Sequence, residues 1–157
     1  MEEQLVETWR IHARILLFLL AGVSDEGLAS THAPRQKTVI AHFAHVHNVR
    51  LMWLKAANPA LLEGLVKFDD AGKTPPTRDE LVIALEASAD AIATLLTDAF
   101  AHQNGRIKGF KPHACAFVGY LVAHESYHIG KIDQTLRIAG HPTDDKTHYG
   151  LFEWGVR

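Results

Sequence analysis

The sequence has one cysteine, no long hydrophobic run and almost no net charge. A single thiol, Cys115, excludes a disulfide within the chain and favours a reducing compartment, so we expect a cytoplasmic protein. The longest apolar stretch, ILLFLLAGV, is too short to span a bilayer, and the acidic start MEEQLVETWR lacks the basic region of a signal peptide. The formal net charge of −2 gives no reason to expect a nucleic acid or a membrane as partner.

What the sequence does contain is an ordinary globular composition and many histidines. Its 157 residues, 47% hydrophobic and 22% charged, suit one domain over residues 1–157 with a sizeable core. Eleven histidines are a high count for this length. The excess points to metal or proton chemistry.

The apolar spacing predicts helices and no sheet. A strong start signal is the pair Thr77 and Glu80, which fits a capping box, and Pro112 is expected at the first position of the last helix. Four long segments have helical periodicity: residues 2–21, 37–57, 81–100 and 113–139. We therefore predict an all-α protein, a four-helix bundle with a long connection between the second and third helices.

The long connection leaves the order of packing open. Its sequence, AANPALLEGLVKFDDAGKTPP, allows a short helical turn in PALLEGL and a crossover between non-adjacent helices. The tail TDDKTHYGLFEWGVR carries aromatic residues that we expect to pack over the bundle.

A pattern typical of metal sites lies in the last helix. In AHESYHIGKI, His124 and His128 are four residues apart, so both imidazoles can reach one divalent ion. A catalytic zinc usually has three protein ligands and a water, so another helix must supply the third ligand. The second helix offers AHFAHVHNVR, where His42 and His45 share a face and His47 points roughly the other way. Spacing alone leaves His42 and His45 both open.

The two histidine segments together resemble a known family. RQKTVIAHFAHVHNVRLMWL on the second helix and LVAHESYHIGKIDQTLRIAG on the fourth are similar to the DinB-like (YfiT-like) metal-binding four-helix bundles, and the similarity covers nearly the whole chain. The resemblance implies a three-histidine site made by His45, His124 and His128, with His42 as the fallback. It also implies a homodimer and thiol-dependent chemistry, such as transfer of bacillithiol or mycothiol to a small molecule.

The resulting first hypothesis is a metal-dependent enzyme. It would hold one divalent ion, zinc or nickel, and activate a low-molecular-weight thiol or water for transfer to a small electrophile. The alternative is a non-catalytic metal-binding bundle that acts as a stress-response or sensor protein, and a third is a plain bundle that picks up nickel through its histidines. A more remote alternative is a zinc hydrolase, because H-E-x-x-H also occurs in metalloproteases beside an edge strand.

Three further residues are candidates for a catalytic role. Glu125 could accept a hydrogen bond from a metal ligand or relay protons, and the alternative is a solvated surface residue. Asn48 could hydrogen-bond a metal-bound water, and Tyr127 could line the pocket. Arg50 is expected to form a structural salt bridge, and Cys115 to be a buried small residue.

Overall fold

The computed structural model describes residues 2–69 and 73–157, and the regular elements in these ranges are all helices. No residue in these two ranges belongs to a β-strand, and none of their helices combines the length and the apolarity needed to cross a membrane. The predicted all-α class is therefore confirmed. The elements are α1 (Glu2–Gly22), α2 (Asp25–Ala29), α3 (Val39–Ala57), the 3₁₀ turn η1 (Pro59–Leu62), α4 (Arg78–His102), α5 (Ala114–Ile138), α6 (Asp145–Gly150) and η2 (Trp154–Val156).

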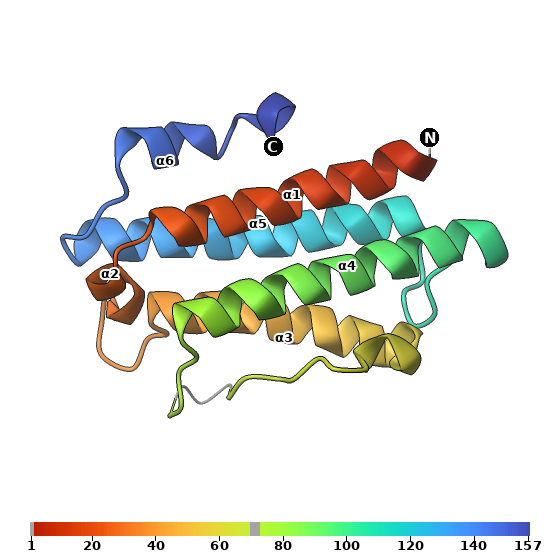
Figure 1. Ribbon diagram of the computed structural model, residues 1–157, viewed down its shortest axis with the longest axis horizontal. Coiled ribbons are helices and arrows are strands. Elements are labelled where there is room, and N and C mark those ends of the chain that lie inside the picture. Colours follow the sequence, from red (N-terminus) through yellow and green to blue (C-terminus); the bar gives the residue numbers. More distant parts are fainter. Residues whose placement is uncertain (1, 70–72) are drawn as a thin grey trace.

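The four long helices α1, α3, α4 and α5 form a ring. Helix α1 packs on α4 and α5, and α3 packs on the same two helices, so α1 and α3 lie on one diagonal. Figure 1 shows that α1 and α5 run in one direction and that α3 and α4 run in the other. The long connection therefore returns along the bundle and joins parallel neighbours. The expected crossover between non-adjacent helices is wrong; residues 70–72 of this connection lie outside the described part.

Local capping explains where the helices begin. The backbone N–H of Thr77 donates to the Glu80 carboxylate at 2.7 Å, and the N–H of Glu80 donates to the Thr77 hydroxyl at 3.2 Å, so the predicted capping box is confirmed. Helix α5 begins differently: the His113 imidazole caps it by accepting from the N–H of Ala116 at 3.2 Å. Pro112 lies before this cap, so its predicted place at the first helical position is wrong.

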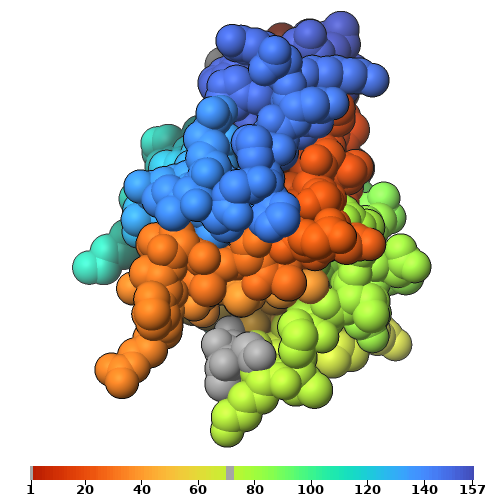
Figure 2. All heavy atoms as spheres, turned by 90° about the vertical axis from the view of Figure 1, so that its left-hand side faces the viewer, coloured from red at the N-terminus to blue at the C-terminus, as the bar shows by residue number. Residues whose placement is uncertain are grey.

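The C-terminal segment lies along α1. The Arg157 guanidinium stacks 3.7 Å from the ring centroid of Phe18, and the Arg14 side chain donates to the Arg157 carbonyl at 2.9 Å. The centroids of the Trp154 and His12 rings are 6.3 Å apart. Figure 2 views the bundle from the end where α2 lies, with the C-terminal segment in blue above α1 and the orange segment between α2 and α3 projecting outwards. The expected packing of the tail over the bundle holds only in part: Trp154 contacts His12 but is 38% exposed, and Phe152 is 74% exposed.

The core consists of two apolar layers separated by a polar one. One layer is built around Leu16, Phe43 and Leu85, and the other around Trp9, Ile92 and Phe117. On every long helix a buried polar residue lies in sequence between the members of the two layers and takes part in one hydrogen-bonded group. These residues are His12, Arg50, Ser88 and Glu125. We call this set the central polar layer.

Candidate metal centre

Three histidines predicted as ligands lie together between α3 and α5. One ring nitrogen each of His45, His124 and His128 lies within 4.8 Å of the other two, the separation expected of groups that could bind one ion. The ring centroids of His45 and His128 are 4.7 Å apart, as are those of His124 and His128. The two α5 histidines point the same way because four residues make about one helical turn. His45 comes from the adjacent helix, which runs in the opposite direction.

Burial favours the neutral form of His124 and His128, which is the form that metal ions bind. His128 is 7% exposed, and burial, with the nearby His124 and His45, lowers its pKa to about 3. Burial also lowers the pKa of His124. The Nδ1 atom of His124 is buried and has no hydrogen-bond partner among the described residues. A neutral imidazole with an unsatisfied nitrogen fits a metal ligand, so the donor set matches the ion that was predicted.

His42 is close to the cluster but outside it. Its Nδ1 lies 2.9 Å from the Nδ1 of His128, which is a hydrogen-bond distance. Burial, followed by the positive charge of Lys37, lowers the pKa of His42 to about 4, so one neutral ring donates to the other. His42 does not belong to the group whose ligand atoms are mutually within 4.8 Å. Of the two histidines left open by spacing, the structure therefore brings His45 to the cluster and makes His42 a partner of His128.

Glu125 belongs to the central polar layer rather than to the metal cluster. It is 1% exposed, and its two carboxylate oxygens accept from Nε and Nη2 of Arg50, both at 2.7 Å. The Nε2 atom of His12 lies 3.1 Å from the same carboxylate. The interpretation as a solvated surface residue is wrong, and this carboxylate is already used by partners in the core. The predicted structural role of Arg50 in a salt bridge is confirmed.

The Glu125 carboxylate is held in its charged form. Burial would raise its pKa, but the charge and hydrogen bonds of Arg50, with a hydrogen bond from His12, outweigh burial and lower it. Arg50 also donates to the Leu85 carbonyl at 2.9 Å, and its Nη1 lies 3.4 Å from the Ser88 hydroxyl. All four long helices therefore meet in one hydrogen-bonded layer.

The other two catalytic candidates lie at different places. The Asn48 amide donates to the Phe68 carbonyl and accepts from the Phe68 N–H, each at 3.0 Å, so it fastens the long connection to α3. Tyr127 is 61% exposed, and its ring centroid lies 5.3 Å from that of His128. Tyr127 thus borders the cluster, whereas the Asn48 side chain holds backbone. Cys115, expected to be buried, is exposed.

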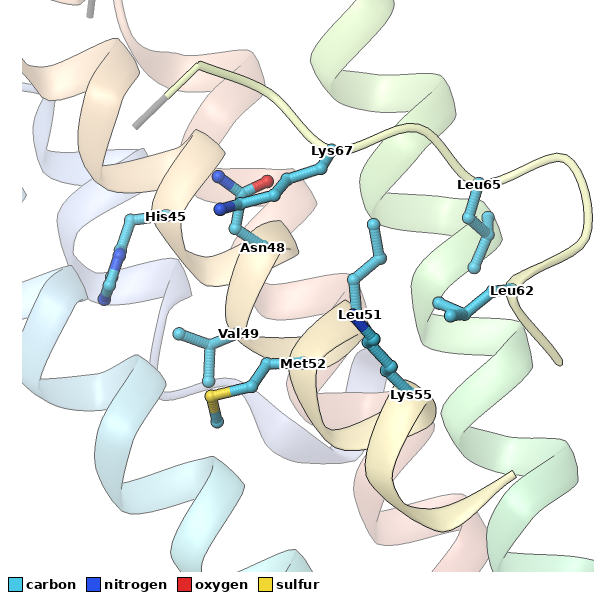
Figure 3. A pocket seen from close by; sticks show the side chains of 9 residues that line it. All are labelled: His45, Asn48, Val49, Leu51, Met52, Lys55, Leu62, Leu65 and Lys67. Atoms are coloured by element: carbon cyan, nitrogen blue, oxygen red, sulfur yellow. The ribbon is translucent and has the colours of Figure 1, made fainter. Parts of the chain in front are cut away.

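A groove of about 530 Å³ begins at the cluster and follows α3. Figure 3 shows it between the exposed side of α3 and the connection that returns beside this helix. Among the residues that the structure describes, its lining is mostly apolar and includes two lysines and no carboxylate. The groove is lined by His45, Asn48, Val49, Leu51, Met52, Lys55, Leu62, Leu65 and Lys67. Only His45 and Asn48 of these were predicted from the sequence as site residues. The available signal for the groove wall was the stretch LLEGLVK, in which apolar residues are followed by a lysine.

Comparison with known protein families gives an identification. The model of the DinB family matches residues 1–155. The chain belongs to the DinB family. Neither the curated proteins nor the solved structures yield a significant match. The family identification agrees with the resemblance seen in the two histidine segments, and the structure adds a cluster that could hold a metal ion.

Proposed function

We propose that this DinB-family protein is a divalent-metal-dependent enzyme that activates a small thiol, or water, for transfer to a small electrophile. The observation that carries the proposal is the cluster of His45, His124 and His128 at one end of an open groove. Three neutral imidazoles with no carboxylate would hold an ion without cancelling its charge, and three protein ligands leave a coordination position free. When bound, zinc or nickel would lower the pKa of a coordinated thiol or water.

The chain's own residues then have separate tasks. His45, His124 and His128 would bind the ion from two antiparallel helices. His42 would orient His128: because the His128 Nδ1 faces His42, its Nε2 is left for the ion. The buried pair of Arg50 and Glu125 joins the same two helices and fixes their relative position. The groove gives a small molecule access to the cluster.

Two observations weigh against the alternatives. A purely structural zinc site normally has four protein ligands, and within the described residues the group that meets the distance criterion has three. In the H-E-x-x-H hydrolases the glutamate acts as general base, whereas Glu125 is engaged by Arg50 and His12 in the core. The homodimer, the cytoplasmic location and the absence of a nucleic-acid or membrane partner stay predictions.

The test of the site is metal content. Untagged protein should carry about one zinc or nickel ion per chain by elemental analysis, and His45→Ala, His124→Ala and His128→Ala should each lose it while circular dichroism stays helical. His102→Ala removes an exposed histidine at the end of α4 and is the matched control. Metal-free wild type, or equal metal retention by all four variants, would contradict the proposal.

The test of catalysis follows with metal-loaded protein. A low-molecular-weight thiol and a small electrophile should react faster with the wild type than with His124→Ala, as measured by thiol consumption. If the wild type binds its ion tightly but accelerates neither thiol transfer nor hydrolysis, the non-catalytic alternative replaces the enzyme.

A further inference from the structure

The groove beside the metal cluster has the composition of a site for an amphipathic anion. Its walls are apolar: Val49 and Met52 come from α3, and Leu62 and Leu65 come from the connection on the other side. Most of the lining surface is therefore hydrocarbon, which favours an apolar ligand body. Lys55 adds a positive charge to the lining, and none of the lining residues in the described part of the chain is a carboxylate.

The groove runs from the metal cluster to a lysine. His45 belongs both to the cluster and to the lining, and Lys55 is ten positions further along α3. Ten helical residues extend about 15 Å. In Figure 3 the Lys55 side chain turns back along α3 toward Leu51, which directs its ammonium group into the groove. A molecule in the groove can therefore have one end at His45 and the other at Lys55.

The outer wall is fixed by hydrogen bonds. Both Asn48–Phe68 bonds, at 3.0 Å, hold the connection against α3 just after Leu62 and Leu65. In Figure 3 Lys67 crosses in front of Asn48, at the same part of the groove. Because these hydrogen bonds join groups of the protein itself, they pre-organise the wall, which reduces the ordering cost of binding.

We propose that the groove binds an amphipathic carboxylate, with its apolar body against Val49, Met52, Leu62 and Leu65 and its carboxylate at Lys55. This inference rests on the proposed function where it places the reactive end of the molecule near His45. It names the substrate class: an electrophile carrying an apolar chain or ring and a remote carboxylate. Binding in the groove itself requires no metal ion.

Decanoate is a suitable probe, and the neutral decanamide has the same chain. We expect calorimetric titration of the zinc-loaded protein to show tighter binding of decanoate than of decanamide. Lys55→Met should weaken decanoate about two- to fivefold, as expected for an exposed ion pair, and leave decanamide unchanged. Met52→Asp should weaken both. Lys108→Met removes an exposed lysine outside the groove and should change neither.

The metal-free His124→Ala variant separates this inference from the proposed function. Decanoate should bind it as it binds the wild type, because His124 does not line the groove. If the carboxylate binds the ion instead, His124→Ala will lose decanoate and Lys55→Met will keep it, which overturns the inference while the metal site stands. Equal binding of decanoate and decanamide also overturns it. Retained groove binding in a protein that never holds metal would refute only the proposed function.

Discussion

Two polar clusters lie one residue apart on α5 and have opposite characters. His124 faces the ring nitrogens of His45 and His128, whereas Glu125 faces Arg50 and His12 in the bundle interior. In the central polar layer the carboxylate has a partner for each oxygen. In the histidine cluster the Nδ1 of His124 has none among the described residues. Buried polar groups are normally satisfied, so the central polar layer acts as structure, whereas the unsatisfied Nδ1 of His124 is consistent with a group that could hold a metal ion.

Both clusters shift pKa values downward, but with opposite results for charge. The lowered pKa of Glu125 keeps the carboxylate ionised beside Arg50. The lowered pKa values of His124 and His128 keep the imidazoles neutral. One cluster therefore holds a fixed ion pair, and the other holds uncharged donors ready for a cation.

The largest expected effect is on stability, from Glu125→Gln. The substitution preserves shape but leaves the buried Arg50 guanidinium without a counter-charge, which costs about 3–5 kcal/mol. Urea denaturation should show this loss, while Asp90→Asn, which breaks the exposed pair with Arg10, should change stability little. If the Glu125→Gln protein is as stable as the wild type but does not bind zinc, Glu125 belongs to the metal site and not to the central polar layer.

Next in size is the effect of His42→Ala on metal affinity. Loss of the ring that orients a ligand typically weakens metal binding 10–100-fold. We expect this range for zinc in a chelator competition, between the full loss in His45→Ala and the unchanged affinity of His102→Ala. Complete loss of zinc in His42→Ala would make His42 a ligand, and unchanged affinity would remove its orienting role.

A smaller effect is expected for Asn48→Ala. The variant loses both hydrogen bonds to the Phe68 backbone, which lowers stability by about 1–2 kcal/mol. Zinc affinity should stay as in the wild type, because the Asn48 amide is bonded to the Phe68 backbone and Asn48 is not a member of the histidine cluster. The same denaturation and competition measurements test this, and a selective loss of zinc would restore Asn48 as a residue of the metal site.

The smallest expected effect is that of mild acid on zinc affinity. His128 titrates normally near 6.5 but at about 3 in the folded protein, and the pKa of His124 is also lowered. Between pH about 7.5 and about 6 His128 stays neutral and the lowered pKa of His124 favours its neutral form, so competition by protons at these two ligands should weaken zinc binding by less than about threefold. An affinity that falls in step with an ordinary histidine titration would contradict the neutral cluster.

The same shifts set the sign of acid destabilisation. Below pH 6.5 these histidines bind protons in the unfolded chain. In the folded protein the lowered pKa values keep His42 neutral down to pH about 4 and His128 neutral down to pH about 3. The metal-free protein should therefore lose stability as the pH falls through this window. Glu125 adds a second loss below its unfolded value of 4.5, as the pH approaches its lowered folded value. Denaturation midpoints of His128→Ala, compared with the wild type, isolate the first window.

Local signals in the sequence were enough for most of the fold and for the histidine cluster. Helical spacing and the Thr77–Glu80 capping box act over a few residues, as does the pair His124 and His128. The choice of His45 over His42 came from the family resemblance, because both residues share one helix face. The structure places His45 with the α5 pair.

Long-range partners explain what the sequence did not reveal. Glu125 is a core residue because its carboxylate accepts from Arg50, which is 75 positions away in sequence and lies on the adjacent helix α3. No local sequence pattern indicates a pairing between residues so far apart in the chain. The groove wall was missed for a similar reason: Leu62 and Leu65 lie in a connection with no helical period. The Asn48–Phe68 and His47–Val66 hydrogen bonds that hold this connection against α3 join residues 19 or 20 positions apart.

The parallel arrangement of α3 and α4 has a consequence for how this protein can diversify. Since the chain must return along the bundle between these helices, it passes the metal cluster outside the core and forms the groove wall. Exchanges of the groove-lining Leu62, Leu65 and Lys67 would change this wall, whereas the three histidines come from α3 and α5. Selection can therefore alter what this scaffold recognises without rebuilding what it does chemically.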